Sequence, residues 1–320
     1  MKTMLTLGLL LLPTAAFAED LAPIRKQVEE QVAKLPVTAQ FDISYAGNAN
    51  PKQMLDLYLP KTKASDKPLP VVVFIHGGAW KNGDRIRSAG TVLPYVTSGK
   101  YAGISVSYRL SDEAKWPAQI HDCKAVIRWI RANAAKYGLD ADHIGVMGSS
   151  AGGHLVSLLG TTGDVSELEG DVGPYKTQNS RVTCVVNICG PQDFQMPLMI
   201  RDGKPVTEDP AVAGLLGGAL AEKKDAVIAS SPITYVTKDD APFLTLHGTK
   251  DERVDFKHAL RIDEALTKVG VSSLLVPITG QGHGLSHPQM HARIGQFFDR
   301  HLRGGKVEIP AGALEPVAKK

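Results

Sequence analysis

Cysteine and blocks of like charge are scarce in this sequence, and each shortage excludes a class of protein. Only 3 of the 320 residues are Cys, which excludes a disulfide scaffold, and 31 Gly without a repeat exclude a collagen-like chain. The 36 Lys and Arg and 33 Asp and Glu are spread evenly, so we expect no nucleic-acid partner. Hydrophobic residues at 43% and charged residues at 22% are typical of a globular protein with a sizeable core.

Long apolar runs are also missing, and a short one lies at the N-terminus. Residues 1–18 have the pattern of a secretory signal peptide, with Lys2 at the positive end, an apolar stretch over Met4–Leu12 and a small-residue cleavage site at Ala16-Phe17-Ala18. The apolar stretch is well short of the roughly 20 residues that span a bilayer, so we expect no membrane anchor. The sequence therefore predicts a periplasmic or secreted protein that is cleaved after Ala18.

The three cysteines form an odd set. Cys184 and Cys189 belong to one β-rich run, where about five residues of strand separate them by roughly 16 Å, so they cannot bridge unless the strand breaks. A bridge from Cys123 to either one stays open. We favour three buried free thiols.

Short apolar runs alternate with stretches of helical periodicity along most of the chain. The sequence predicts strands at 41–45, 54–59, 71–75, 102–106, 144–147, 182–188, 242–246 and 273–278. It predicts helices at about 118–134, 151–159, 256–269 and 290–302. Apolar strands separated by helices indicate an α/β fold, with a mostly parallel central sheet and helices on both faces.

Three segments lie outside this alternation. Residues 19–40 are predicted to hold a short amphipathic helix docked on the body, because Val28 and Val32 continue a helical spacing. Residues 190–230 are rich in Pro and Gly, and we predict a short helical cap insertion over the strand ends rather than a separate domain. Residues 303–320 are expected to be a loosely held tail, which leaves residues 41–302 as the main domain.

The strongest chemical signal is a G-x-S-x-G pentapeptide, Gly148-Ser149-Ser150-Ala151-Gly152, that follows an apolar strand and opens a helix. A sharp strand-to-helix turn exposes the Ser150 hydroxyl, and only small neighbours such as Gly148 and Gly152 let the backbone close so tightly. The helix N-terminus also favours negative charge that develops nearby. We predict that Ser150 is a nucleophile; the alternative is an ordinary Gly/Ser turn that caps a helix.

A second motif, His76-Gly77-Gly78-Ala79-Trp80, directly follows the predicted strand 71–75. Its two glycines let backbone N–H groups point into a site, so Gly77, Gly78 and the N–H of Ala151 are predicted to form an oxyanion hole. The alternative is a Gly-rich turn beside a core tryptophan. We expect His76 to be a structural hydrogen-bonding residue rather than a base.

A serine nucleophile needs a base, and the base needs an orienting carboxylate. We favour Asp251, which lies in the loop after the penultimate predicted strand, and His283, which lies between glycines after the last one. Asp193 and Glu252 are the rival acids, and His287 is the rival base.

His283, His287 and His291 recur every four residues, but the first lies in a Gly-rich loop and no carboxylate follows at matching spacing. We therefore expect no metal site. The sequence has no P-loop, dinucleotide fingerprint, H-E-x-x-H or C-x-x-C motif, and the predicted chemistry requires no cofactor.

Together these motifs resemble the α/β-hydrolase superfamily over roughly residues 41–302. Within it the chain is similar to a secreted esterase/lipase-like group that contains bacterial feruloyl and acetylxylan esterases (BD-FAE-like). The segments that carry the resemblance are His76–Trp80, Ser107–Leu110, Pro117–Asp122, Gly148–His154 and Ser231-Pro232. Relatives of hormone-sensitive lipase usually have an acidic residue before the nucleophile, where this chain has Ser149. They also usually have a third Gly where this chain has Ala79. Both differences point away from that subgroup.

The resemblance implies a serine carboxylesterase that forms an acyl-enzyme, with Ser150 as nucleophile, His283 as base and Asp251 as orienting acid, in the chain order expected for this fold. An amidase, formamidase-like or peptidase-like serine hydrolase is the alternative, and a catalytically inactive binding protein is a third reading.

We expect the substrate to be a short-chain, acetyl or feruloyl ester of plant polysaccharide, because the chain is predicted to be exported and the cap insertion is short. Trp80, Phe194 and Met196 are the candidate substrate-binding residues, since they are apolar and lie near the predicted oxyanion glycines or in the insertion. The sequence leaves the oligomeric state open.

Overall fold

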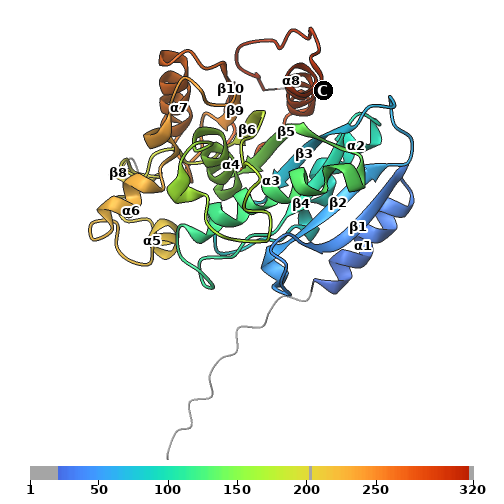
Figure 1. Ribbon diagram of the computed structural model, residues 1–320. Helices are drawn as coiled ribbons and strands as arrows, with labels where there is room; N and C mark the ends of the chain where they lie inside the picture. The colour runs from blue at the N-terminus through green and yellow to red at the C-terminus, as the bar shows by residue number, and fades with distance from the viewer. Residues whose placement is uncertain (1–20, 202–203, 317–320) are drawn as a thin grey trace, which may run out of the picture.

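The computed structural model describes residues 21–201 and 204–316. An eight-stranded sheet in the order β1-β2-β4-β3-β5-β6-β9-β10 forms its centre (Figure 1). The strands are β1 (Val37–Ser44), β2 (Met54–Pro60), β3 (Leu69–Ile75), β4 (Ala102–Val106), β5 (Leu139–Ser149), β6 (Cys184–Ile188), β9 (Phe243–Gly248) and β10 (Ser273–Ile278). Strand β2 is antiparallel to both of its neighbours, and the remaining pairs are parallel, so the predicted mostly parallel sheet is confirmed.

Helices cover both faces of the sheet (Figure 1). One buried cluster contains the apolar sides of α3 (Ala118–Tyr137), α4 (Ala151–Thr161) and α7 (Lys257–Lys268), and the other contains those of α1 (Ala22–Ala33), α2 (Ala89–Thr97) and α8 (Met290–Arg303). Short 3-10 helices are η1 (Pro51–Gln53), η2 (Ile86–Ser88), η3 (Ser166–Leu168) and η4 (Pro232–Tyr235). The predicted α/β fold is therefore confirmed.

Helix α2 was not predicted, because Pro94 lies inside it and proline disfavours a helix interior. Packing against the sheet overrides that preference. A Cβ on Gly103 of β4 would lie 2.6 Å from Val96 Cγ2, so the glycine is what lets the helix approach this closely. Val92 and Val96 are buried in the contact.

The N-terminal helix α1 lies within the segment where a helix was predicted, and it buries Val28 and Val32. Strand β1 begins earlier than predicted, at Val37. Arg25 of α1 donates hydrogen bonds to Asp42 at 2.8 Å and to the buried carboxylate of Asp56 at 3.1 Å. Arg85 also donates to Asp56, at 3.1 Å, so one ionic network ties α1 to the edge of the sheet.

The segment between β6 and β9 contains α5 (Pro210–Leu216) and α6 (Lys224–Ala229), which lie on the side of the molecule away from α1 (Figure 1). It also contains a two-stranded antiparallel ribbon, β7 (Ile200–Arg201) and β8 (Lys204–Pro205), which the sequence did not predict. Asp209 caps α5 by accepting the N–H groups of Ala211 and Val212.

The expectation of a loosely held C-terminal tail is wrong for the part that the structure describes. After α8 the chain turns back and Leu314, which is 2% exposed, forms a bridge to Ile278 of β10. Thr279 N–H donates to the Leu314 carbonyl at 3.0 Å, and Leu314 N–H donates to the Pro277 carbonyl at 2.8 Å. Val307, Ile309 and Leu314 are scattered among polar and small residues, a pattern too weak to predict this edge contact.

Cys123, Cys184 and Cys189 are free and buried. None of the described helices is long and apolar enough to cross a membrane. The predicted signal peptide, residues 1–18, lies outside the described residues.

Candidate active site

Three side chains from distant parts of the chain meet at the carboxyl ends of the parallel strands. Ser150 follows β5, Asp251 follows β9 and His283 follows β10. Ser150 Oγ lies 2.9 Å from His283 Nε2, and His283 Nδ1 lies 2.8 Å from Asp251 Oδ2. Because a carboxylate only accepts, Nδ1 carries the proton and Nε2 is free to accept from the serine hydroxyl. The structure thus brings the three predicted residues into one hydrogen-bonded row.

The turn that holds Ser150 has an unusual backbone, with φ of 54° and ψ of −120°. Its neighbours must be glycine. A Cβ on Gly148 would lie 2.3 Å from the Gly152 carbonyl oxygen, and one on Gly152 would lie 2.0 Å from the Ile75 carbonyl oxygen. This strained turn places the serine hydroxyl at the strand end and directs it away from the sheet, as expected of a nucleophile on this type of fold.

The loop after β3 passes directly against the serine. A Cβ on Gly77 would lie 2.8 Å from the Ser149 carbonyl oxygen and 3.2 Å from Ser150 Cβ. Within the described residues, the backbone N–H groups of Gly77, Gly78 and Ala151 donate no hydrogen bond. Gly77 and Gly78 line the cavity that holds the serine, and Ala151 is the first residue of α4. These donors are therefore available to a ligand.

Asp251 is held by four hydrogen bonds. Its Oδ1 accepts the N–H groups of Arg253 and Val254 at 2.8 and 2.9 Å, and its Oδ2 accepts from His283 and, at 3.1 Å, from His247 Nε2. Burial by itself would raise the pKa of Asp251, but the bonds from His247 and His283 outweigh it and hold that pKa well below its usual range. The carboxylate is therefore ionised beside the imidazole.

Sequence reasoning missed His247 and Cys189 as neighbours of Asp251. His247 Nε2 also lies 2.9 Å from the Val254 carbonyl oxygen, and since both of its partners are acceptors, Nε2 carries the proton. The donor atoms of Cys189, His247 and Asp251 lie within 4.8 Å of one another. Burial raises the pKa of the Cys189 thiol, and Asp251 is already saturated with donors, so this set does not fit a metal ion. The only sequence signal was that His247 lies on the strand that leads to Asp251.

The rival residues have other partners. Asp193 is buried and pairs with Arg261 at 2.7 Å, whereas Glu252 is exposed. His287 Nε2 lies 3.0 Å from the Glu315 carbonyl oxygen, in the docked C-terminal segment. His76 is buried, stacks on Tyr108 at 4.5 Å between ring centroids, and lies 2.7 Å from the Gly77 carbonyl oxygen through Nδ1, as expected of a structural residue.

A cavity of about 530 Å³ contains Ser150, His283 and Trp80 in its lining. Trp80 is 2% exposed, and its indole N–H donates to His154 Nδ1 at 3.2 Å. His154 Nε2 in turn lies 2.6 Å from the Ser230 carbonyl oxygen. The tryptophan is therefore a fixed part of the cavity wall, held by the helix behind it.

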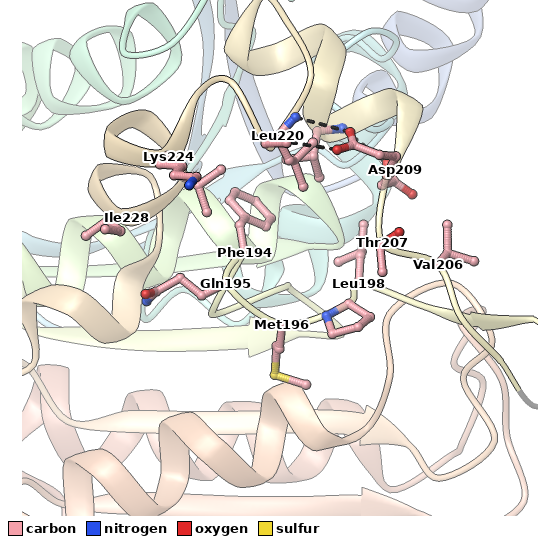
Figure 2. Close-up of a pocket in the computed structure, with 15 residues that line it drawn as sticks. Phe194, Gln195, Met196, Leu198, Val206, Thr207, Asp209, Leu220, Lys224 and Ile228 are labelled. Atoms are coloured by element: carbon pink, nitrogen blue, oxygen red, sulfur yellow. Dashed lines mark hydrogen bonds between the residues drawn. The ribbon is translucent and has the colours of Figure 1, made fainter.

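Phe194 and Met196 line a different cavity, of about 570 Å³, in the segment between β6 and β9 (Figure 2). Leu198 and Asp209 line both cavities and lie between them. Figure 2 shows the apolar floor that Phe194 and Leu198 contribute. Of the three predicted substrate-binding residues, Trp80 therefore lines the cavity of Ser150. Phe194 and Met196 line the adjoining cavity.

The sheet order, the strained serine turn and the Ser–His–Asp row define an α/β hydrolase. A family model described as BD-FAE matches residues 55–266, and the chain belongs to this family. The resemblance read from the sequence is confirmed.

Two curated relatives are mycobacterial esterases. The chain is 32% identical to "Esterase LipC" of Mycobacterium tuberculosis over 73% of this chain and 57% of that protein. It is 29% identical to "Probable carboxylic ester hydrolase LipM" of the same organism, over 71% of this chain and 52% of that protein. The chain therefore spans about half the length of the curated relatives that it matches.

Two solved structures are similar over most of this chain. The "truncated form of carbohydrate esterase from gut microbiota" has a TM-score of 0.77 and 31% identity, covering 83% of this chain and 96% of that one. A "bifunctional GH43-CE" from Bacteroides eggerthii has a TM-score of 0.75 and 36% identity, covering 82% of this chain and 38% of that one.

The buried histidines around the site predict how stability depends on pH. Burial lowers the pKa of His76, His154 and His258 to about 4. Between pH 6.5 and 4 the unfolded chain binds protons that the folded protein excludes, so the unfolding free energy falls as the pH falls. The slope is about 1.4 kcal/mol per pH unit for each histidine. Asp240, whose pKa burial raises to about 6, and Asp56, whose pKa burial also raises, oppose this trend, whereas burial lowers the pKa of His121 and His301 and adds to it.

Urea unfolding at several values between pH 7 and 4 measures this slope. His258→Gln removes one of the buried imidazoles and should reduce the slope, whereas His143→Gln, at a side chain that is 45% exposed, should leave it unchanged. A flat unfolding free energy over this range, or equal slopes in the two variants, would contradict the prediction.

Proposed function

We propose that this protein is a serine carboxylesterase that works through an acyl-enzyme. The observation that carries the proposal is the row of hydrogen bonds from Ser150 Oγ through His283 to the ionised Asp251, beside a cavity of about 530 Å³. Membership of the BD-FAE family and the similarity to esterases support ester hydrolysis as the reaction.

In the first half of the proposed reaction, Ser150 Oγ attacks the ester carbonyl carbon while His283 Nε2 takes the hydroxyl proton. Asp251 holds the imidazole in the tautomer that leaves Nε2 free, and its charge stabilises the imidazolium. The carbonyl oxygen becomes an oxyanion next to the free N–H groups of Gly77, Gly78 and Ala151. His283 then gives its proton to the departing alcohol.

In the second half, water takes the place of the alcohol. His283 accepts a proton from the water, which attacks the acyl carbon, and the same backbone N–H groups stabilise the second oxyanion. Return of the proton to Ser150 Oγ releases the acid and restores the free enzyme. His247, which donates to the same carboxylate oxygen as His283, is a positioning residue in this scheme.

The proposed substrate is a short-chain or feruloyl/acetyl ester of plant polysaccharide. The solved structures that are similar include a carbohydrate esterase, and the predicted export of the chain favours an extracytoplasmic ester. The catalytic cavity has the volume of an ordinary small-molecule site. Phe194 and Met196, whose cavity adjoins it across Leu198, are proposed to contact the part of a bulky substrate that lies beyond the ester.

Replacement of the nucleophile tests the reaction. Ser150→Ala should lower turnover of p-nitrophenyl acetate by about 10⁶-fold, the loss known for removal of the nucleophile of a serine hydrolase. The neighbouring Ser149→Ala is the matched control and should keep most of the activity, with thermal unfolding confirming that both variants fold. More than a few per cent residual activity in Ser150→Ala would overturn the assignment. A parallel assay on p-nitroacetanilide separates an esterase from an amidase.

Replacement of the acids tests the orienting residue. Asp251→Asn should leave KM nearly unchanged and lower kcat by roughly 10³–10⁴-fold, because the imidazole loses its tautomer and its charge partner. Asp193→Asn should keep kcat but unfold more easily, because it weakens the pair with Arg261. The opposite ranking of kcat would show that Asp193 serves His283.

Acyl preference is measured with p-nitrophenyl esters from acetate to palmitate, alongside acetylated xylan and methyl ferulate. We expect the highest kcat/KM on short chains, because the cap insertion is short and most of its apolar residues line a separate cavity. A maximum at chains of about twelve carbons or more, with no activity on acetate, would favour a lipase instead.

A further inference from the structure

One cation lines the catalytic cavity without a partner. Arg253 is an exposed residue in the wall of the cavity that also holds Ser150 and His283. Its guanidinium forms no ion pair or side-chain hydrogen bond with any residue in the described ranges, 21–201 and 204–316. The five N–H donors of the guanidinium therefore have no partner among the described residues, on a residue that lines the cavity.

Several arginines that serve the fold are used differently. Arg85 pairs with Asp56, Arg109 with Asp122 and Arg128 with Glu169. Arg261, on helix α7 a few residues after Arg253, pairs with Asp193 at 2.7 Å. Each of these cations is neutralised by the protein, whereas Arg253 is not.

The backbone beneath Arg253 is fixed to the catalytic machinery. Its N–H donates to Asp251 Oδ1 at 2.8 Å, and the next residue, Val254, is 4% exposed and donates to the same oxygen at 2.9 Å. The guanidinium therefore extends from an anchored point two residues from Asp251. A rigid anchor makes a charged side chain useful for selecting a substrate, because less freedom is lost on binding.

Among the described residues, no carboxylate of the cavity pairs with this cation. Asp209 lines the same cavity but lies beyond ion-pair distance of Arg253, and its Oδ1 accepts two N–H groups at the start of α5. Asp251 already accepts four hydrogen bonds. A planar guanidinium with unused donors matches the two oxygens of a carboxylate.

We propose that Arg253 is a specificity-determining residue that pairs with a carboxylate carried by the ester substrate. This rests on the proposed esterase function and narrows its substrate class to anionic esters. The carboxylate has two possible sources with the same chemistry. It belongs to the acyl group, as in a half-ester of a dicarboxylic acid, or to the alcohol, as in an acetylated uronic acid residue.

Matched pairs of esters test the proposal and separate the two sources. The acyl pair is mono-p-nitrophenyl glutarate against p-nitrophenyl valerate, and the alcohol pair is acetylated methyl glucuronoside against acetylated methyl glucoside. We expect the wild-type protein to have the lower KM for the charged member of one pair. Arg253→Gln should raise that KM roughly five- to tenfold, with kcat and the neutral ester unchanged. Arg253→Lys should recover part of the loss, because lysine keeps the positive charge but lacks the planar set of N–H donors that binds both carboxylate oxygens.

Lys250→Gln is the matched control, because it removes one positive charge from the same loop outside the cavity lining. It should leave both members of each pair unchanged. The proposal is overturned if Arg253→Gln changes charged and neutral esters equally, which would indicate a role in packing or in binding sugar hydroxyls. It is also overturned if kcat falls on every ester, which would indicate that the residue acts through Asp251, or if the wild type shows no preference in either pair.

Failure of the esterase proposal is recognised separately, because the neutral p-nitrophenyl valerate would then not be hydrolysed either. The carboxylate site is still tested in that case by calorimetric titration of monomethyl glutarate, and separately of acetylated methyl glucuronoside, into Ser150→Ala, with and without Arg253→Gln. Weaker binding of either ligand in the double variant supports the site, and equal binding of both ligands overturns it.

Discussion

Asp251 is a buried carboxylate that accepts four hydrogen bonds, and the arrangement of the site depends on it. Two backbone N–H groups hold one oxygen, so the loop after β9 closes around the charge. The imidazoles of His247 and His283 share the other oxygen. His247 is buried on β9, and His283 reaches Ser150. A buried charge is tolerated only when it is paired, and here the pairing also orients the His283 imidazole.

The parallel sheet makes this possible, because the carboxyl ends of β3, β5, β6, β9 and β10 meet at one edge. β5 supplies the serine turn, and the loop after β3 supplies free N–H groups within a few ångströms of it. Glycines at Gly148 and Gly152 let helix α4 start directly against β3. Main-chain geometry thus fixes Ser150 and the N–H groups beside it.

The segment between β6 and β9 divides the space above this edge. Leu198 and Asp209 stand between the catalytic cavity and the apolar one around Phe194. The lining of the two cavities differs: Arg253 lines the cavity of Ser150, and the neighbouring cavity is lined mainly by aliphatic and aromatic side chains, with Glu208 and Lys224 among them. A substrate that has an anionic group near its ester and an apolar part farther away would match both.

The sequence by itself determined the alternating strands and helices, the serine turn and the two glycines opposite it, because each depends on neighbours within a few residues. The sequence also predicted Ser150, Asp251 and His283, the three residues that the structure joins by hydrogen bonds. Only the tertiary structure decided that Asp193 is paired with Arg261, that His247 and Cys189 adjoin Asp251, and that Phe194 and Met196 lie outside the catalytic cavity. The same holds for helix α2, formed despite Pro94, and for the tail docked through Leu314. These features are contacts between residues far apart in the chain. Local periodicity cannot predict them, because it does not indicate which distant part of the chain packs on a given side chain.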